Sequence, residues 1–149
     1  TKLIAVNLGT DQSKLSYSIK ALNCNQVLSL PSSYLYEPNA AIMKSGLFGA
    51  LCQSFKISAI GLNSHLFTSE SLINFPGRVF RIIKTISPKK KEIHKHLPSK
   101  KANITTRNYP LKPSQIKKKY NLKDGGTKFV FFTENMKKQK IVLICKKIE

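Results

Sequence analysis

The chain has 149 residues, 41% of them hydrophobic, and its 26 lysine and arginine residues outnumber 7 acidic residues, giving a formal net charge of +19. This length suits one domain or two small packed units, and the hydrophobic content excludes a disordered basic tail. The longest stretch without a charged residue, 21–36, is too short and too polar to cross a bilayer, so we expect no transmembrane helix.

Strand patterns occupy the first 30 residues. An apolar run from Leu3 to Leu8 is followed by alternating apolar and polar residues over 15–20, which predicts a hairpin. Residues 27–30 are expected to form a further short strand that ends at Pro31.

A helix is expected after these strands. Pro38 can occupy its first turn, and apolar residues then recur at helical spacing as far as Phe55. Glu37 is expected to help cap this helix. Gly46 and Gly49 either weaken it or mark close packing.

Short strands are expected before and after residue 76, where the sequence changes from nearly neutral to basic. Residues 58–60 and 66–68 form two of them, and residues 79–86 have the β-branched composition of a strand with one wetted face. Ser87 and Pro88 then have the residue types of an N-cap and a first helical position.

The remaining elements complete a small α/β pattern. Residues 102–106 are expected to form a strand, and Pro113 is expected to begin a second helix. The apolar segments 129–133 and 141–145 are separated by polar residues, which predicts a hairpin. The order strand, helix, strand, helix, strand, strand indicates a mixed sheet.

The positive charge is concentrated in the second half. Residues 1–75 contain 5 lysines and 3 acidic residues, a net charge of +2, whereas residues 76–149 contain 21 lysines and arginines and 4 acidic residues, a net charge of +17. This imbalance favours a polyanionic partner. The alternative is a general bias toward lysine, which supplies 23 of the 26 basic residues, but that bias does not explain the first half.

Three lysine clusters and one arginine are the candidate nucleic-acid-binding residues. Three successive lysines cover roughly 200° of a helix surface, so at least two of those near Ile116 and Tyr120 point away from that apolar face. Because lysines contact phosphates without reading bases, we expect recognition of folded RNA by shape. A solvated polar face is the alternative for each cluster. The candidates are Lys89, Lys90, Lys91, Lys100, Lys101, Arg107, Lys117, Lys118 and Lys119.

The other arginines and a tyrosine are expected to have structural roles. Arg78 and Arg81 lie three apart in a strand and therefore face opposite sides, so one of them is expected to pair internally with Glu70 or Glu37. Tyr109 is expected to pack against the core.

The sequence contains no catalytic constellation. It has no glycine-rich phosphate loop. His94 and His96 diverge on a helix, so they form no metal pair and are expected to be exposed. Cys145 lies in an apolar strand pattern, which favours a buried residue over a nucleophile. We therefore expect no enzymatic activity and no cofactor in this chain.

The cysteines and the first residue bear on the cellular context. The three cysteines have no paired spacing, which predicts reduced thiols in a cytoplasmic protein. The chain opens at Thr1 inside an apolar run, so we expect it to be part of a longer protein.

Five segments together resemble the C-terminal region of a bacterial family of class I SAM-dependent methyltransferases with a THUMP-like domain, common in Bacteroidetes. The combination is specific although each segment alone is weak. The segments are YLYEPNAAIMKSG (34–46), NSHLFTS (63–69), FPGRVFR (75–81), KANITTRNYPL (101–111) and LKDGG (122–126).

The resemblance implies an α/β (α+β) fold of two small packed units with mixed sheets. Residues 1–30 would end, or connect from, a methyltransferase domain outside this chain; 31–76 would be a ferredoxin-like segment and 77–149 a THUMP-like domain. It implies that S-adenosylmethionine is bound by the other domain, which would be a partner of this region.

These expectations lead to one hypothesis and one alternative. The chain is predicted to be a non-catalytic accessory region of a SAM-dependent RNA methyltransferase that binds tRNA or rRNA through its lysines, with no membrane partner. The alternative is a structural or protein-docking module whose charge serves an acidic partner or solubility.

Overall fold

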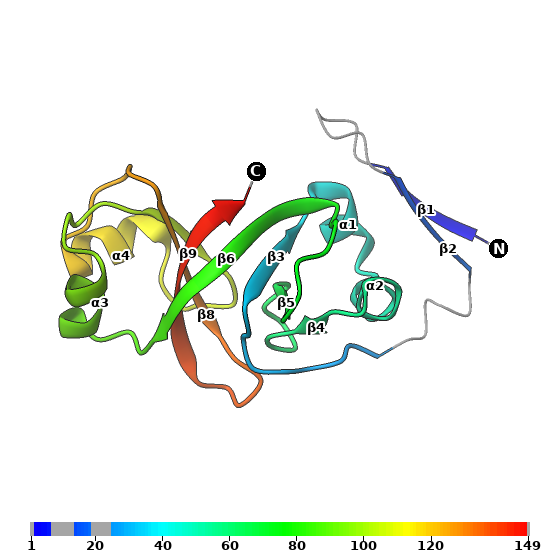
Figure 1. The fold of residues 1–149 in the computed structure, drawn as a ribbon, viewed down its shortest axis with the longest axis horizontal. Helices are drawn as coiled ribbons and strands as arrows, with labels where there is room; N and C mark the ends of the chain where they lie inside the picture. The colour runs from blue at the N-terminus through cyan, green and yellow to red at the C-terminus, as the bar shows by residue number, and fades with distance from the viewer. Residues whose placement is uncertain (1, 7–13, 19–24, 149) are drawn as a thin grey trace.

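The computed structural model describes residues 2–6, 14–18 and 25–148 (Figure 1). Within these ranges no helix has the length and apolar character needed to cross a membrane. The elements are β1 (Lys2–Val6), β2 (Lys14–Ser18), β3 (Tyr34–Pro38), α1 (Ala40–Ser45), α2 (Phe48–Phe55), β4 (Ser58–Ala59), β5 (Phe67–Ser69), β6 (Gly77–Ile86), α3 (Lys90–His96), β7 (Asn103–Thr106), α4 (Pro113–Tyr120), β8 (Lys128–Glu134) and β9 (Lys140–Ile148).

One seven-stranded sheet runs through both halves of the chain. Its order is β4-β5-β3-β6-β9-β8-β7, and all neighbours are antiparallel except β7 and β8, which are parallel. Together with the four helices in the described residues, this mixed sheet confirms the α/β (α+β) class. The ten-residue strand β6 joins the halves, because it pairs with β3 on one side and with β9 on the other.

The predicted N-terminal hairpin is confirmed as a separate two-stranded sheet. β1 and β2 pair antiparallel, with Lys2 opposite Ser18 and Val6 opposite Lys14. The turn expected between them lies outside the described residues.

The large sheet curls so that strands far apart in its order come together. The side chain of Glu37 on β3 bonds Arg107, which follows β7, although β6, β9 and β8 lie between those strands in the sheet. The curled sheet encloses an apolar core on its inner face. This core includes Leu35, Phe80, Phe131, Leu143 and Cys145, all fully buried.

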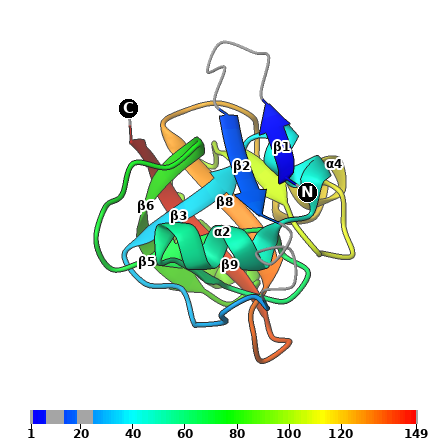
Figure 2. The ribbon, with the colours of Figure 1, turned by 90° about the vertical axis from the view of Figure 1, so that its right-hand side faces the viewer.

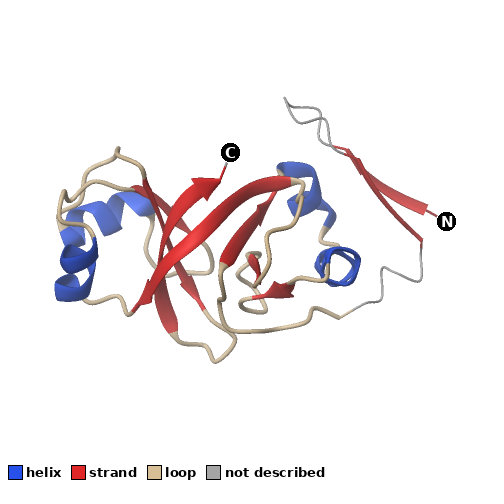
Figure 3. Cartoon of the chain, viewed as in Figure 1, coloured by secondary structure: helices blue, strands red, loops and turns tan. Residues whose placement is uncertain are grey.

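The helices pack on the outer face in two pairs, which lie toward opposite ends of the sheet (Figure 3). Ile93 of α3 and Ile116 of α4 are fully buried against Phe132 and Ile144 of the sheet. At the other end α2 lies across the strands (Figure 2), and its Leu51 joins a second core. Each half of the chain therefore has its own helix-covered core.

The helix expected from Pro38 is wrong in its start and in its continuity. Pro38 is the last residue of β3, which the sequence patterns had not indicated, and Asn39 is the N-cap, accepting a hydrogen bond from the backbone N–H of Ile42 at 3.1 Å. Gly46 has a φ of +68°, which ends α1 before α2 begins. Glu37 caps no helix, since its carboxylate bonds two arginines.

Two further boundaries differ from the predictions. The segment 27–30 contributes one isolated bridge, between Leu28 and Ala59, in place of a strand. α3 has Lys89 as its N-cap, with no side-chain cap hydrogen bond, so the proposed cap at Ser87 is wrong. The other strands, the helix beginning at Pro113 and the β8–β9 hairpin are confirmed.

Candidate nucleic-acid interface

The lysines at the start of α3 project into solvent. Lys89, Lys90 and Lys91 are all exposed, and the structure gives none of them a carboxylate partner among the described residues. They stand at the positive end of the helix dipole, where cations are disfavoured by about 0.3–1 kcal/mol each. Helix stability therefore does not explain this cluster.

The α4 cluster is divided by one ion pair. Lys117 is half-buried, and its Nζ donates to Asp124 Oδ2 at 2.8 Å, whereas Lys118 and Lys119 are exposed. All three lie in the last turn, where cations stabilise the negative end of the helix dipole. As predicted, Ile116 is buried while Lys118 and Lys119 are exposed, and Nζ of Lys119 lies 5.4 Å from the centre of the Tyr120 ring.

A third group of lysines lines a small hollow between the ends of α3 and α4. Lys123 donates its backbone N–H to the carbonyl of Lys100 at 2.8 Å and accepts from Ala102 at 2.9 Å, which holds these segments side by side. The hollow has a volume of about 310 Å³. We call it the basic hollow; its lining residues are Ser99, Lys100, Lys101, Asn121 and Lys123.

Lys123 is the residue that the sequence patterns missed. It stands alone in the sequence, 22 positions after Lys101, and only the bridge between the two residues brings it to the hollow. All three lysines of the basic hollow are exposed, and none has a carboxylate partner within the described part of the chain. Their charges can therefore act together on one anion.

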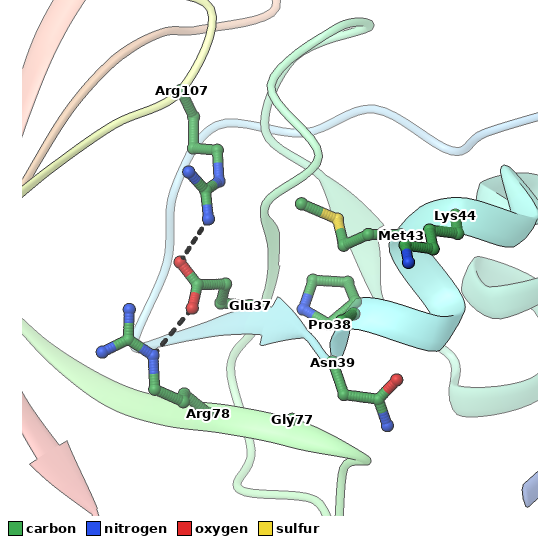
Figure 4. Close-up of a pocket in the computed structure, with 9 residues that line it drawn as sticks. Glu37, Pro38, Asn39, Met43, Lys44, Gly77, Arg78 and Arg107 are labelled. Atoms are coloured by element: carbon green, nitrogen blue, oxygen red, sulfur yellow. Dashed lines mark hydrogen bonds and ion pairs between the residues drawn. The ribbon is translucent and has the colours of Figure 1, made fainter. Parts of the chain in front are cut away.

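Arg107 differs from the lysines because a buried carboxylate already holds it (Figure 4). Its Nη2 donates to Glu37 Oε2 at 2.9 Å, and its Nη1 donates to the carbonyl of Thr106 at 3.1 Å. Arg78 completes the cluster by donating from Nε to Glu37 Oε1 at 2.7 Å. The predicted internal pairing of Arg78 with Glu37 is confirmed, and the phosphate contact of Arg107 stays a prediction.

This ion triplet lines a hollow where the two halves of the chain meet. The hollow has a volume of about 660 Å³, and Pro38 and Met43 form an apolar side (Figure 4). Glu37 is only 7% exposed and neutralises one of its two arginines. Cζ of Arg78 also lies 5.2 Å from the centre of the Phe80 ring. We call the triplet of Glu37, Arg78 and Arg107 the clasp, because its ion pairs join the two halves of the chain.

The histidines are tied into the structure rather than exposed as predicted. His94 is half-buried and donates from Nε2 to the carbonyl of Tyr120 at 2.6 Å, which ties α3 to the end of α4. His96 donates from Nδ1 to the carbonyl of Glu92. His65 stacks on Phe48 with ring centroids 4.4 Å apart, and burial together with nearby Arg107 lowers its pKa.

The two cysteines in the described part of the chain, Cys52 and Cys145, are both buried. Cys145 is fully buried, as predicted, and burial raises the pKa of its thiol well above the ordinary value. Burial also raises the pKa of Cys52. Among the described residues, no group of three or more histidine, cysteine, aspartate and glutamate side chains is placed to hold a metal ion.

Among the described residues, the turns that lead from a strand into a helix in the large sheet, β3–α1, β6–α3 and β7–α4, contain no glycine. Gly125 and Gly126 have positive φ, but they lie in the connection from α4 to β8, away from any strand-to-helix turn that would present backbone N–H groups. The strand-to-helix turn from β3 to α1 contains Asn39 in place of a glycine.

Comparison with known families places two domains on this sheet. Residues 34–76 match the family of the ferredoxin-like domain, and residues 77–147 match the family described as THUMP domain-like. The chain joins a ferredoxin-like domain to a THUMP-like domain. All nine predicted contact residues, and Lys123, lie in the THUMP-like domain. The proposed boundaries at residues 30 and 76 stay predictions.

A solved structure shares this arrangement. The crystal structure of a "putative methyltransferase from Porphyromonas gingivalis W83" matches 99% of this chain with a TM-score of 0.87 and 28% sequence identity. The chain spans only 38% of that protein. No curated protein matches the chain.

Proposed function

We propose that the chain is a non-catalytic accessory region of a SAM-dependent RNA methyltransferase, and that it holds structured RNA, such as tRNA or rRNA, by its phosphates. The observation that carries this proposal is the state of the predicted lysines. Seven of the nine candidates are exposed and have no carboxylate partner in the described residues, and all seven belong to the THUMP-like domain.

The lysines at the start of α3 give the strongest support. A charge retained where the helix dipole opposes it has no structural benefit in the folded chain, whereas a phosphate backbone would use it. The lysines of α4 are weaker support, because their position at the end of that helix is stabilising by itself.

Methyl transfer is assigned to a domain outside this chain. The similarity to a putative methyltransferase, of which the chain spans 38%, supports this division. S-adenosylmethionine would be bound in that domain, which is the expected partner of this region, and the whole protein would act in the cytoplasm.

The test compares RNA binding by matched charge variants of the intact chain. A structured tRNA transcript is titrated with the unmodified chain and with the triple variant Lys89→Gln, Lys90→Gln, Lys91→Gln. The control is Lys56→Gln, Lys137→Gln, Lys138→Gln, which removes the same charge from exposed lysines elsewhere. If the three α3 lysines each neutralise one phosphate, binding at 0.1 M salt falls by roughly 100-fold or more in the first variant only.

Two results would contradict the proposal. Equal loss in both triple variants would mean that only the net charge matters and that no defined surface binds RNA. No retention of RNA by the unmodified chain, even at low ionic strength, would favour the protein-docking alternative.

A further inference from the structure

Three cations lie side by side across neighbouring strands of the THUMP-like domain. Arg81 on β6 is paired with Lys146 on β9, and Lys146 is paired with Lys128 on β8. Directly paired residues point to the same face of a sheet, and neighbouring strands are about 4.8 Å apart. We call these three residues the cationic row.

The cationic row has no counterion in the described part of the chain. The ion pairs found there use Glu37 and Asp124, and neither carboxylate reaches the row. Arg81 and Lys146 are exposed, and Lys128 is half-buried. Because like charges directly opposite each other destabilise a sheet, the row lowers the stability of the folded chain. A contribution to folding therefore does not explain why these three cations lie together.

The row lies in a strip between the two helix-covered cores. Ile144, two residues before Lys146 and on the same face, is buried under α3 and α4. On the other side Tyr34, paired with Arg81, packs against the core that α2 covers. The helix pairs lie toward opposite ends of the sheet (Figures 1 and 3), and in the strip between them the side chains of Arg81 and Lys146 are exposed.

The row leads into the basic hollow. Next to Lys128, the side-chain amide of Asn103 donates to the carbonyl of Lys128 at 3.2 Å and to that of Gly126 at 3.1 Å. Gly126 in turn lies against Lys101, whose Cβ is 3.6 Å from the position that a Gly126 Cβ would take. These contacts connect the row to the lysines of the hollow, and the one acidic residue of the connecting segment, Asp124, is paired with Lys117.

We propose that the cationic row is the track along which the phosphodiester backbone of RNA crosses the sheet, and that the basic hollow is its end. The inference rests on the proposed RNA-binding function and adds to it a path over β6, β9 and β8. The contacts are to phosphates, so binding along the track is independent of base sequence. The charges that destabilise the free chain are then neutralised in the complex.

The experiment removes the row and measures both stability and RNA binding. The variant is Arg81→Gln, Lys128→Gln, Lys146→Gln in the intact chain, and Lys56→Gln, Lys137→Gln, Lys138→Gln is again the control of equal charge. Row removal is expected to leave the melting temperature at or above that of the unmodified chain. Affinity for a tRNA transcript at 0.1 M salt should fall by about 100-fold to 500-fold, and the slope of log K against log salt should become shallower by about 2 to 3.

The outcomes separate this inference from the proposed function. If the unmodified chain binds RNA and the row variant binds as the control does, the track is wrong while RNA binding by the α3 lysines stands. If polyglutamate with the same number of charges displaces the RNA as well as a second RNA does, the row is a general acid-binding surface and the inference fails. If the unmodified chain does not bind RNA at all, the proposed function fails first and the track with it.

Discussion

Replacing Glu37 with glutamine tests the clasp between the two halves. The side chain of Glu37 is 9% exposed and accepts hydrogen bonds from Arg78 at 2.7 Å and from Arg107 at 2.9 Å. Glutamine keeps the size, but it removes the charge and turns an NH₂ group toward one arginine donor. A hydrogen bond to a charged group contributes about 1.5–3 kcal/mol, and the partial exposure of both arginines lets water offset part of the loss.

We expect Glu37→Gln to lower the free energy of unfolding by about 2–3 kcal/mol, which for a chain of this size is about 4–12 °C in melting temperature. Differential scanning calorimetry measures it. Glu70→Gln is the matched control, because Glu70 is exposed and has no ion pair within the described ranges. A melting temperature for Glu37→Gln within about 1 °C of this control would refute the clasp.

Three other variants probe the fold. Ile116→Ala, at a fully buried site, should lower the free energy of unfolding measured in urea by about 2–5 kcal/mol. Ser114→Ala, at an exposed site of the same helix, should lower it by less than about 0.5 kcal/mol. Equal losses in the two variants would contradict the packing of α4. Gly77→Ala would place a Cβ 2.1 Å from the Glu37 carbonyl oxygen and should lower the free energy of unfolding by about 3 kcal/mol or more. Gly46→Ala, whose Cβ would meet no atom within 4 Å, should lower it by about 1 kcal/mol. A larger loss for Gly46→Ala than for Gly77→Ala would refute the β3–β6 register. Burial and neighbouring Tyr120 raise the pKa of Tyr109 from 10.0 to about 12, so the folded state favours the protonated phenol. The resulting contribution to the free energy of unfolding should be complete below pH 10 and lost as the pH rises toward 12. Urea unfolding of Tyr109→Phe should show a smaller decrease in the free energy of unfolding between pH 10 and pH 12 than the unmodified chain does. An equal decrease in both proteins would mean that Tyr109 does not cause it.

The elements predicted from sequence are those with strong local patterns. Apart from Thr133, residues 129–133 and 141–145 are apolar because both faces of β8 and β9 are covered, and they form the expected hairpin. β3 was missed because a proline at position 38 is typical of the first turn of a helix. The place of Pro38 in the sheet is fixed instead by its pairing with Gly77, which lies far along the chain. Local residue preference carries no information on such a partner.

The same distinction applies to the candidate interface. Exposure of the lysine clusters follows from their local sequence, since three adjacent lysines cannot all be buried. The capture of Arg107 by Glu37, 70 residues away, follows only from the curl of the sheet. The cationic row is equally invisible in the sequence, because Arg81, Lys128 and Lys146 become neighbours only through strand register.

The most direct test of RNA binding is a salt titration of the unmodified chain with a structured tRNA transcript. If the exposed lysines neutralise phosphates, log K should fall linearly with log salt, with a slope of about −0.9 for each phosphate neutralised. A binding constant that stays flat as the salt concentration rises would contradict the account.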